Sequence, residues 1–149
     1  MPTAYYSNEF PSLNRVEDQP PGGTQNSVVR IKKATYSMTG LEATNDTIDL
    51  FKLPAGSEVM KVGSFVKSVG TIAATCTLDI GDTDDSVTAA DTDRYATALD
   101  VAAAGLDDFD EDPIYTLGEE ATIRVLFKNL STPTDSGVLH FYVAYRSPE

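Results

Sequence analysis

Clustered carboxylates are the side chains of this sequence that come closest to a chemical site. Two runs, 81–86 (GDTDDS) and 107–112 (DDFDED), supply the oxygen ligands that hard cations such as calcium prefer. An EF-hand calcium loop, however, needs acidic residues at positions 1, 3 and 5, glycine at 6 and glutamate at 12. Counted from Asp82, those last three positions hold Ser86, Val87 and Asp93. The spacing therefore predicts solvated acidic loops, with no metal ligands assigned.

Nucleophilic catalysis would have to use His140 or Cys76, the single histidine and the single cysteine of the chain. A Ser-His-Asp or Cys-His arrangement needs a histidine beside its nucleophile, and no Gly-x-Ser-x-Gly elbow is present. We expect Cys76 to be a small core residue and His140 to lie on a sheet surface or at a subunit interface. Sugar-stacking tryptophan and a Gly-Lys-Ser/Thr phosphate loop are also absent. The sequence predicts no enzyme, no catalytic residues and no cofactor.

The net charge of −12 is concentrated in one stretch. Residues 79–120 hold 14 of the 23 acidic side chains and a single basic one, Arg94. This stretch therefore carries 1 − 14 = −13, and the remainder carries 10 − 9 = +1. We predict an acidic insert, largely loop, that protrudes from a scaffold of strands. Arg94 is expected either to pair with one or more of these acids or to form an exposed ion pair of little energetic value.

Alternating apolar and polar residues predict the strands of that scaffold. The alternation is clearest over 71–80, where Ile72, Cys76 and Ile80 share one face. Residues 137–146 are apolar on both faces, so this strand is expected to be central or to meet another subunit. Strands are predicted over 28–38, 47–53, 58–68, 71–80, 113–117, 121–129 and 137–146, with at most one short helix within 91–104.

Chain length and composition predict a single all-β domain over residues 27–149, a β-sandwich of the jelly-roll type. No apolar run approaches the ~20 residues of a membrane span, and the first residues lack the pattern of a signal peptide. A pI near 4.3 argues against nucleic acid or an anionic membrane as a partner.

Residues 1–26 differ from the rest of the chain. Proline and glycine interrupt them repeatedly, and no hydrophobic period persists. They nevertheless contain Tyr5, Tyr6, Phe10 and Leu13, which a plain linker would not need. We predict an extended N-terminal arm that docks on a neighbouring molecule. The alternative is a frayed terminus with incidental aromatic residues.

Four stretches carry a resemblance that spans about residues 34–146. They are 46–59 (DTIDLFKLPAGSEV), 77–82 (TLDIGD), 93–95 (DRY) and 102–105 (AAAG). In chain order they form a strand, a Pro-Ala-Gly turn, a second strand, an acidic insert and a closing hydrophobic strand. This pattern resembles the capsid decoration (cement) proteins and related small head proteins of tailed bacteriophages. The pattern contains no catalytic motif, and the N-terminal arm lies outside it.

The resemblance implies a virion structural protein that is made in the host cytoplasm and binds the outside of the capsid. Its partners would be the major capsid protein and copies of itself in a homotrimer, bridging capsomers without nucleic acid or membrane. We expect the arm residues Tyr5, Tyr6, Phe10 and Leu13 to contact the capsid or a neighbour. The residues expected at the subunit interface are Arg94, Tyr95, His140, Tyr142 and Arg146.

Two other functions stay open at this point. One is a head-fibre base or tail-associated virion protein, which would form an elongated trimer. The other is a carbohydrate- or calcium-binding β-sandwich module. The absence of tryptophan and of a calcium-loop pattern counts against this second alternative.

Overall fold

A computed structural model of the chain describes residues 28–84, 91–111 and 114–148. Within these ranges no helix is present, and hence none that could cross a membrane. The strands are β1 (Val29–Ser37), β2 (Thr47–Leu53), β3 (Glu58–Val69), β4 (Cys76–Asp82), β5 (Asp91–Asp100), β6 (Gly105–Asp108), β7 (Ile114–Thr116), β8 (Ala121–Leu130) and β9 (Val138–Arg146).

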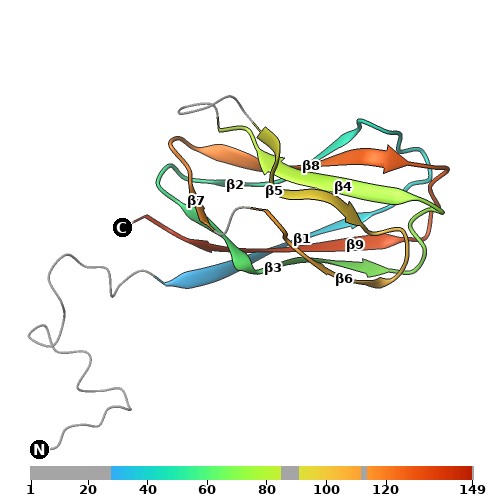
Figure 1. Cartoon of the computed structure of the whole chain (residues 1–149), viewed down its shortest axis with the longest axis horizontal. Coiled ribbons are helices and arrows are strands. Elements are labelled where there is room, and N and C mark those ends of the chain that lie inside the picture. Colours follow the sequence, from blue (N-terminus) through green and yellow to red (C-terminus); the bar gives the residue numbers. More distant parts are fainter. Residues whose placement is uncertain (1–27, 85–90, 112–113, 149) are drawn as a thin grey trace, which may run out of the picture.

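The strands form two antiparallel sheets that pack face to face (Figure 1). Sheet A has the order β1-β9-β3-β6, with β7 also pairing with β3, and sheet B has the order β2-β8-β4-β5. The pairings are nested along the chain, because β1 pairs with β9, β2 with β8, β3 with β6 and β4 with β5. This nesting is the jelly-roll arrangement of a double sheet, and it confirms the predicted all-β sandwich.

Strict alternation places one face of β8 in the core. Ile123, Val125 and Phe127 are fully buried between the sheets, whereas Arg124 and Lys128 point away from them. Each such buried side chain contributes roughly 1.5–3 kcal/mol relative to an exposed one. The predicted strand over 121–129 is therefore confirmed, and its apolar period is the reason that it forms.

The last strand, β9, occupies a central position in sheet A. It pairs with β1 on one side without interruption and with β3 on the other. Leu139, Phe141 and Val143 point into the core and are fully buried. The prediction of a central strand is confirmed. Its other set of side chains forms part of the outward face of sheet A.

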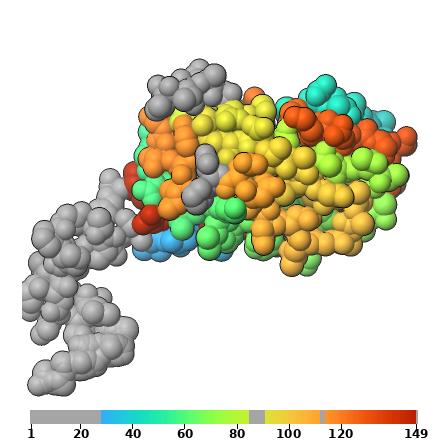
Figure 2. All heavy atoms as spheres, in the orientation of Figure 1, coloured from blue at the N-terminus to red at the C-terminus, as the bar shows by residue number. Residues whose placement is uncertain are grey.

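Two predictions about the acidic segment 79–120 are wrong. It is not largely loop, because it contains the end of β4 and all of β5, β6 and β7. The short helix expected within 91–104 is also absent, since β5 occupies most of that range. Figure 2 shows β5 and β6, in yellow and orange, spread across one side of the sandwich. The described part of this segment belongs to the sandwich and does not protrude from it.

Irregular pairing explains why β5 gives no alternating pattern. The register between β4 and β5 shifts twice, and Ala98 has a positive φ of 53°. Arg94, Tyr95 and Ala96 are consequently buried in succession. A β-bulge changes which face successive side chains occupy, so a period of two residues is lost from the sequence.

Cys76 is a core residue, as predicted, although its strand begins later than expected. The strand predicted from residue 71 starts at Cys76, and Ala74 is exposed in the preceding loop. The Cys76 thiol is fully buried, and burial raises its pKa to about 12. The protonated thiol is therefore inert at neutral pH.

Glu42 organises the connection between β1 and β2. Its carboxylate accepts hydrogen bonds from the backbone N–H groups of Thr39 and Gly40 and from the hydroxyls of Thr39 and Tyr36. Burial opposes ionisation of this carboxyl group, but the hydrogen bonds outweigh burial and lower its pKa to about 2. Glu42 therefore stabilises the loop as an anion.

Replacing Gly81 with alanine is expected to destabilise the fold by about 2–3 kcal/mol. An added Cβ would lie 1.8 Å from the carbonyl oxygen of Asp91, where only backbone could move. The matched control is Gly105→Ala, because no atom lies within 4 Å of a Cβ added there. Urea unfolding of both variants measures the difference. Equal free energies of unfolding would contradict the close approach of β4 and β5.

Glu42→Gln is expected to lower the free energy of unfolding by up to about 3 kcal/mol near neutral pH. The folded pKa is below the ordinary value of 4.5, so this contribution is complete above pH 4.5 and is lost as the pH falls toward 2. Urea titrations of both proteins at decreasing pH should therefore converge. Glu120→Gln, in an exposed ion pair with Lys52, is the control. A gap that stays constant with pH would contradict this account.

Candidate functional site

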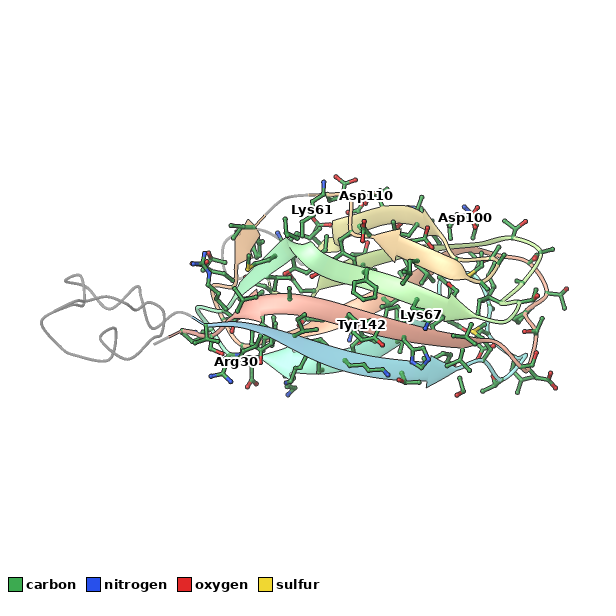
Figure 3. All side chains as sticks on the ribbon, turned by 90° about the horizontal axis from the view of Figure 1, so that it is seen from below. Arg30, Lys61, Lys67, Asp100, Asp110 and Tyr142 are labelled. Atoms are coloured by element: carbon green, nitrogen blue, oxygen red, sulfur yellow. The ribbon has the colours of Figure 1, made fainter. Side chains whose placement is uncertain are left out.

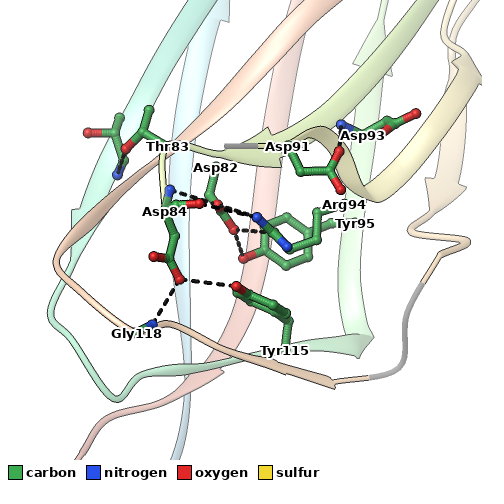
Figure 4. Close-up of polar contacts among 10 residues, drawn as sticks. Asp82, Thr83, Asp84, Asp91, Asp93, Arg94, Tyr95, Tyr115 and Gly118 are labelled. Atoms are coloured by element: carbon green, nitrogen blue, oxygen red, sulfur yellow. Dashed lines mark hydrogen bonds and ion pairs between the residues drawn. The ribbon is translucent and has the colours of Figure 1, made fainter. Parts of the chain in front are cut away.

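A buried ion pair stands at the end of β4. The carboxylate of Asp82 accepts hydrogen bonds from Nε of Arg94 at 3.0 Å and from its Nη2 at 3.3 Å. It also accepts from the hydroxyl of Tyr95 and from the backbone N–H of Asp84 (Figure 4). The side chain of Arg94 is 6% exposed and that of Asp82 is 0% exposed. The single base of the acidic segment is thus paired and buried.

Asp84 extends this network to β7 in sheet A. Its carboxylate accepts hydrogen bonds from the Tyr115 hydroxyl at 3.1 Å and from the Gly118 N–H at 2.8 Å. The guanidinium of Arg94 lies 3.9 Å from the centre of the Tyr115 ring. The network therefore joins β4 and β5 to β7 and to the turn that follows β7.

The protonation states of this network suit a structural role. Burial and the neighbouring Asp82 raise the pKa of Tyr95, and burial raises the pKa of Tyr115. Burial opposes the charge on Arg94, but the adjacent Asp82 outweighs this effect and raises the arginine pKa. Both tyrosines therefore remain hydrogen-bond donors, and Arg94 remains a cation, at neutral pH.

The acidic runs show no cation site within the described residues. No group of three or more His, Cys, Asp or Glu side chains in that part of the chain is arranged to hold a metal ion. Residues 85–90 and 112–113, which complete the two acidic runs, lie outside it.

Three of the predicted interface residues share the outward face of sheet A. His140 lies between Thr35 and Lys67, and its Nδ1 is 3.0 Å from the hydroxyl oxygen of Thr35. Tyr142 stacks on Phe65 with ring centres 4.5 Å apart. Arg146 pairs with Glu58 at 2.6 Å. Burial, followed by Lys33 and Lys67, lowers the pKa of His140, so this face carries a neutral imidazole at neutral pH.

The other predicted interface residues lie elsewhere. Arg94 and Tyr95 are 8% and 2% exposed and make their described contacts within one chain. Their role at a subunit interface stays a prediction. Tyr5, Tyr6, Phe10 and Leu13 lie outside the described residues, and their contacts stay predictions too.

Exposed apolar side chains on the same face were not among the predicted site residues. Ile31 is 59% exposed and Leu106 is 66% exposed, and both point outward from sheet A. The register places Val29, Val69 and Ile114 on this face as well. Residues 29 and 31 do follow a period of two, but that period alone does not tell which face is covered.

The outward face of sheet B has a different character. Asp49 pairs with Arg124 at 2.5 Å, and Lys128 pairs with the buried carboxylate of Asp79 at 3.1 Å. Among the described residues, every large exposed apolar side chain except Leu41 belongs to sheet A or directly precedes it. The two faces of the sandwich are therefore unequal, and sheet A is the candidate binding surface.

Comparisons with known proteins find similarity at the level of structure. No family model matches the chain, and no curated protein matches it. A chain in the capsid of cyanophage Pam1 has a TM-score of 0.66 at 23% identity, covering 95% of this chain and 99% of that chain.

Two further capsid structures contain similar chains. One is the acid-stable capsid of Helicobacter pylori bacteriophage KHP30, with a TM-score of 0.54, 21% identity, and coverage of 83% of this chain and 90% of that chain. The other is the capsid of Ralstonia phage GP4, with a TM-score of 0.62, 16% identity, and coverage of 82% and 86%. The chain therefore shares its fold with chains of three phage capsids.

Asp82→Asn is expected to destabilise the fold by about 3–5 kcal/mol, because it leaves the Arg94 guanidinium buried without a counter-charge. The control is Asp49→Asn, whose partner Arg124 has a side chain that is 37% exposed. Breaking this exposed pair should cost less than about 1 kcal/mol. Chemical denaturation of both variants measures the two costs. Similar losses in the two variants would contradict the central role of the buried pair.

Proposed function

We propose that the chain is a non-catalytic structural protein of a phage virion, bound to the outside of the assembled capsid as a decoration protein. The observation that carries this proposal is the likeness to a chain of the Pam1 capsid, which extends over nearly the whole of both chains. The residue pattern that resembles decoration proteins supports the same function independently. The described polar network supports it as well, because its side chains bind one another and hold the fold together.

In this proposal the protein stabilises the shell by bridging capsomers. Its partners are the major capsid protein and copies of itself, arranged as a homotrimer. Each contact can be weak, because linked copies on a symmetric particle multiply the effect of every contact. The apolar outward face of sheet A and the aromatic residues of the arm are the surfaces assigned to these contacts.

The acidic side of the sandwich has a complementary role. The chain carries a net charge of −12, and β5 contributes the acids Asp91, Asp93 and Asp100 to this side. Negative charge facing solvent on a crowded particle makes particles repel one another. We assign this side to the exterior of the decorated particle.

Capsids that lack this protein should bind it and become more resistant to heat. The purified chain is mixed with such capsids, and binding is measured by co-sedimentation and by the temperature at which the shells release their contents. The controls are the purified chain sedimented without capsids and capsids that already carry the protein. A chain that stays in the supernatant at saturating concentration would refute the decoration function.

Deleting residues 1–26 should leave a folded domain that no longer binds capsids. The described core lies entirely within residues 28–148, so its unfolding transition should persist in the truncated chain. Circular dichroism and thermal unfolding establish that the domain folds, and co-sedimentation then measures binding. Full binding by the truncated domain would show that the arm assignment is wrong.

A further inference from the structure

The outward face of sheet A combines exposed apolar side chains with unpaired cations. Lys33 and Lys67 form no ion pair within the described part of the chain, and Lys33 Nζ lies 5.4 Å from the centre of the Tyr142 ring. Figure 3 shows Tyr142 and Lys67 on this face, with Arg30 at its β1 edge. The face also holds the acids Asp108 and Glu58, but its cations Lys33, Lys67 and Arg146 outnumber them. Such a face is suited to a segment that is both apolar and acidic.

A groove at the edge of this face supplies a place for an aromatic side chain. It lies between the end of β3 and the start of β6 and has a volume of about 530 Å³. Lys67, Val69 and Leu106 line it with side chains of the outward face. A tyrosine would cover the apolar surface of Val69 and Leu106 and keep its hydroxyl group in water.

The side of the molecule that carries β5 disfavours an acidic segment. Asp93, Asp100, Asp110 and Glu111 lie along the side formed by β5, β6 and the residues after β6. Figure 3 shows Asp100 and Asp110 on the side of the molecule opposite to Arg30. Like charges across an interface suppress binding, so an acidic ligand is directed to the face of sheet A.

Residues 1–26 have the chemistry that this face requires. Tyr5, Tyr6 and Phe10 are aromatic, and Leu13 and Val16 are aliphatic. The acids of this arm, Glu9, Glu17 and Asp18, exceed its single base, Arg15, so its side chains carry 1 − 3 = −2. Apolar character and negative charge therefore occur together in the arm, as the face of sheet A requires.

The length of the arm allows a neighbouring copy to receive it. Residues 17–27 separate the apolar part of the arm from β1 and contain Pro20-Pro21, a pair that favours extended backbone. When extended, these residues span up to roughly 36–40 Å. The nine residues of β1 cover only about 30 Å, so this spacer is long enough for the apolar part to reach a neighbouring copy.

We propose that the outward face of sheet A in one copy of this chain receives the N-terminal arm of a second copy, with an arm tyrosine in the groove against Val69 and Leu106. This inference rests on the proposed assembly of several copies on a capsid and adds the surface through which the copies bind one another. The donor and acceptor surfaces differ, so the contact is heterologous, and repetition closes a ring when the rotation between copies allows it.

The test uses full-length protein without capsids and measures self-association by sedimentation equilibrium. The face variant is Lys33→Glu/Lys67→Glu, and its matched control is Lys52→Glu/Arg124→Glu, which makes the same change of charge on sheet B. The arm variant is Tyr5→Ala/Tyr6→Ala/Phe10→Ala, and its control is Thr3→Ala/Ser7→Ala/Asn8→Ala within the same arm. Circular dichroism verifies that every variant is folded.

The face variant and the arm variant should each weaken self-association by roughly tenfold or more, and the two controls should not. A mixture of the two weakened variants should form a one-to-one complex, because one chain keeps an intact arm and the other keeps an intact face. A wild-type monomer, equal effects of variants and controls, or no complex in the mixture would each overturn this inference. Capsid co-sedimentation is measured separately, so such a result leaves the decoration function to its own test.

Discussion

The buried pair between Asp82 and Arg94 is the interaction on which this fold most depends. Two charges removed from water are costly unless they are paired and hydrogen-bonded, and here Tyr95 and the backbone of Asp84 complete the shell of the carboxylate. Asp84 then connects the network to Tyr115. These contacts hold the end of β4, β5 and β7 together within a segment whose charge is −13, although its composition is typical of a solvated loop.

This arrangement gives the parts of the surface different charge and apolar character. Sheet B presents ion pairs such as that between Asp49 and Arg124, and the β5–β6 side presents unneutralised acids. Sheet A presents Ile31, Leu106 and the stacked rings of Phe65 and Tyr142. The proposed decoration function would use this division, with sheet A for binding and the acidic side to keep particles apart.

The strands that alternate regularly could be predicted, and the irregular ones could not. Residues 121–129 place Ile123, Val125 and Phe127 on one face, and β8 forms there. Along β5 the register shifts and Ala98 has a positive φ, so the burial of Arg94 and Tyr95 leaves no period. The residues of the candidate site also fall into a predictable and an unpredictable group. His140, Tyr142 and Arg146 followed from the alternation of the last strand, whereas the exposed positions of Ile31 and Leu106 depend on which strands pair.

The amino-acid sequence by itself determined the class of the fold, the central last strand, the buried thiol of Cys76 and the absence of any recognisable catalytic motif. These conclusions need only local information, because side-chain period and turn residues act over a few neighbouring positions. Only the tertiary structure decided that Asp82 and Arg94, 12 residues apart, form a buried pair, and that the exposed apolar residues gather on one sheet. Both outcomes depend on how strands pair. The pairing decides whether an acid lies beside a buried base or in water, and which apolar side chains share one face.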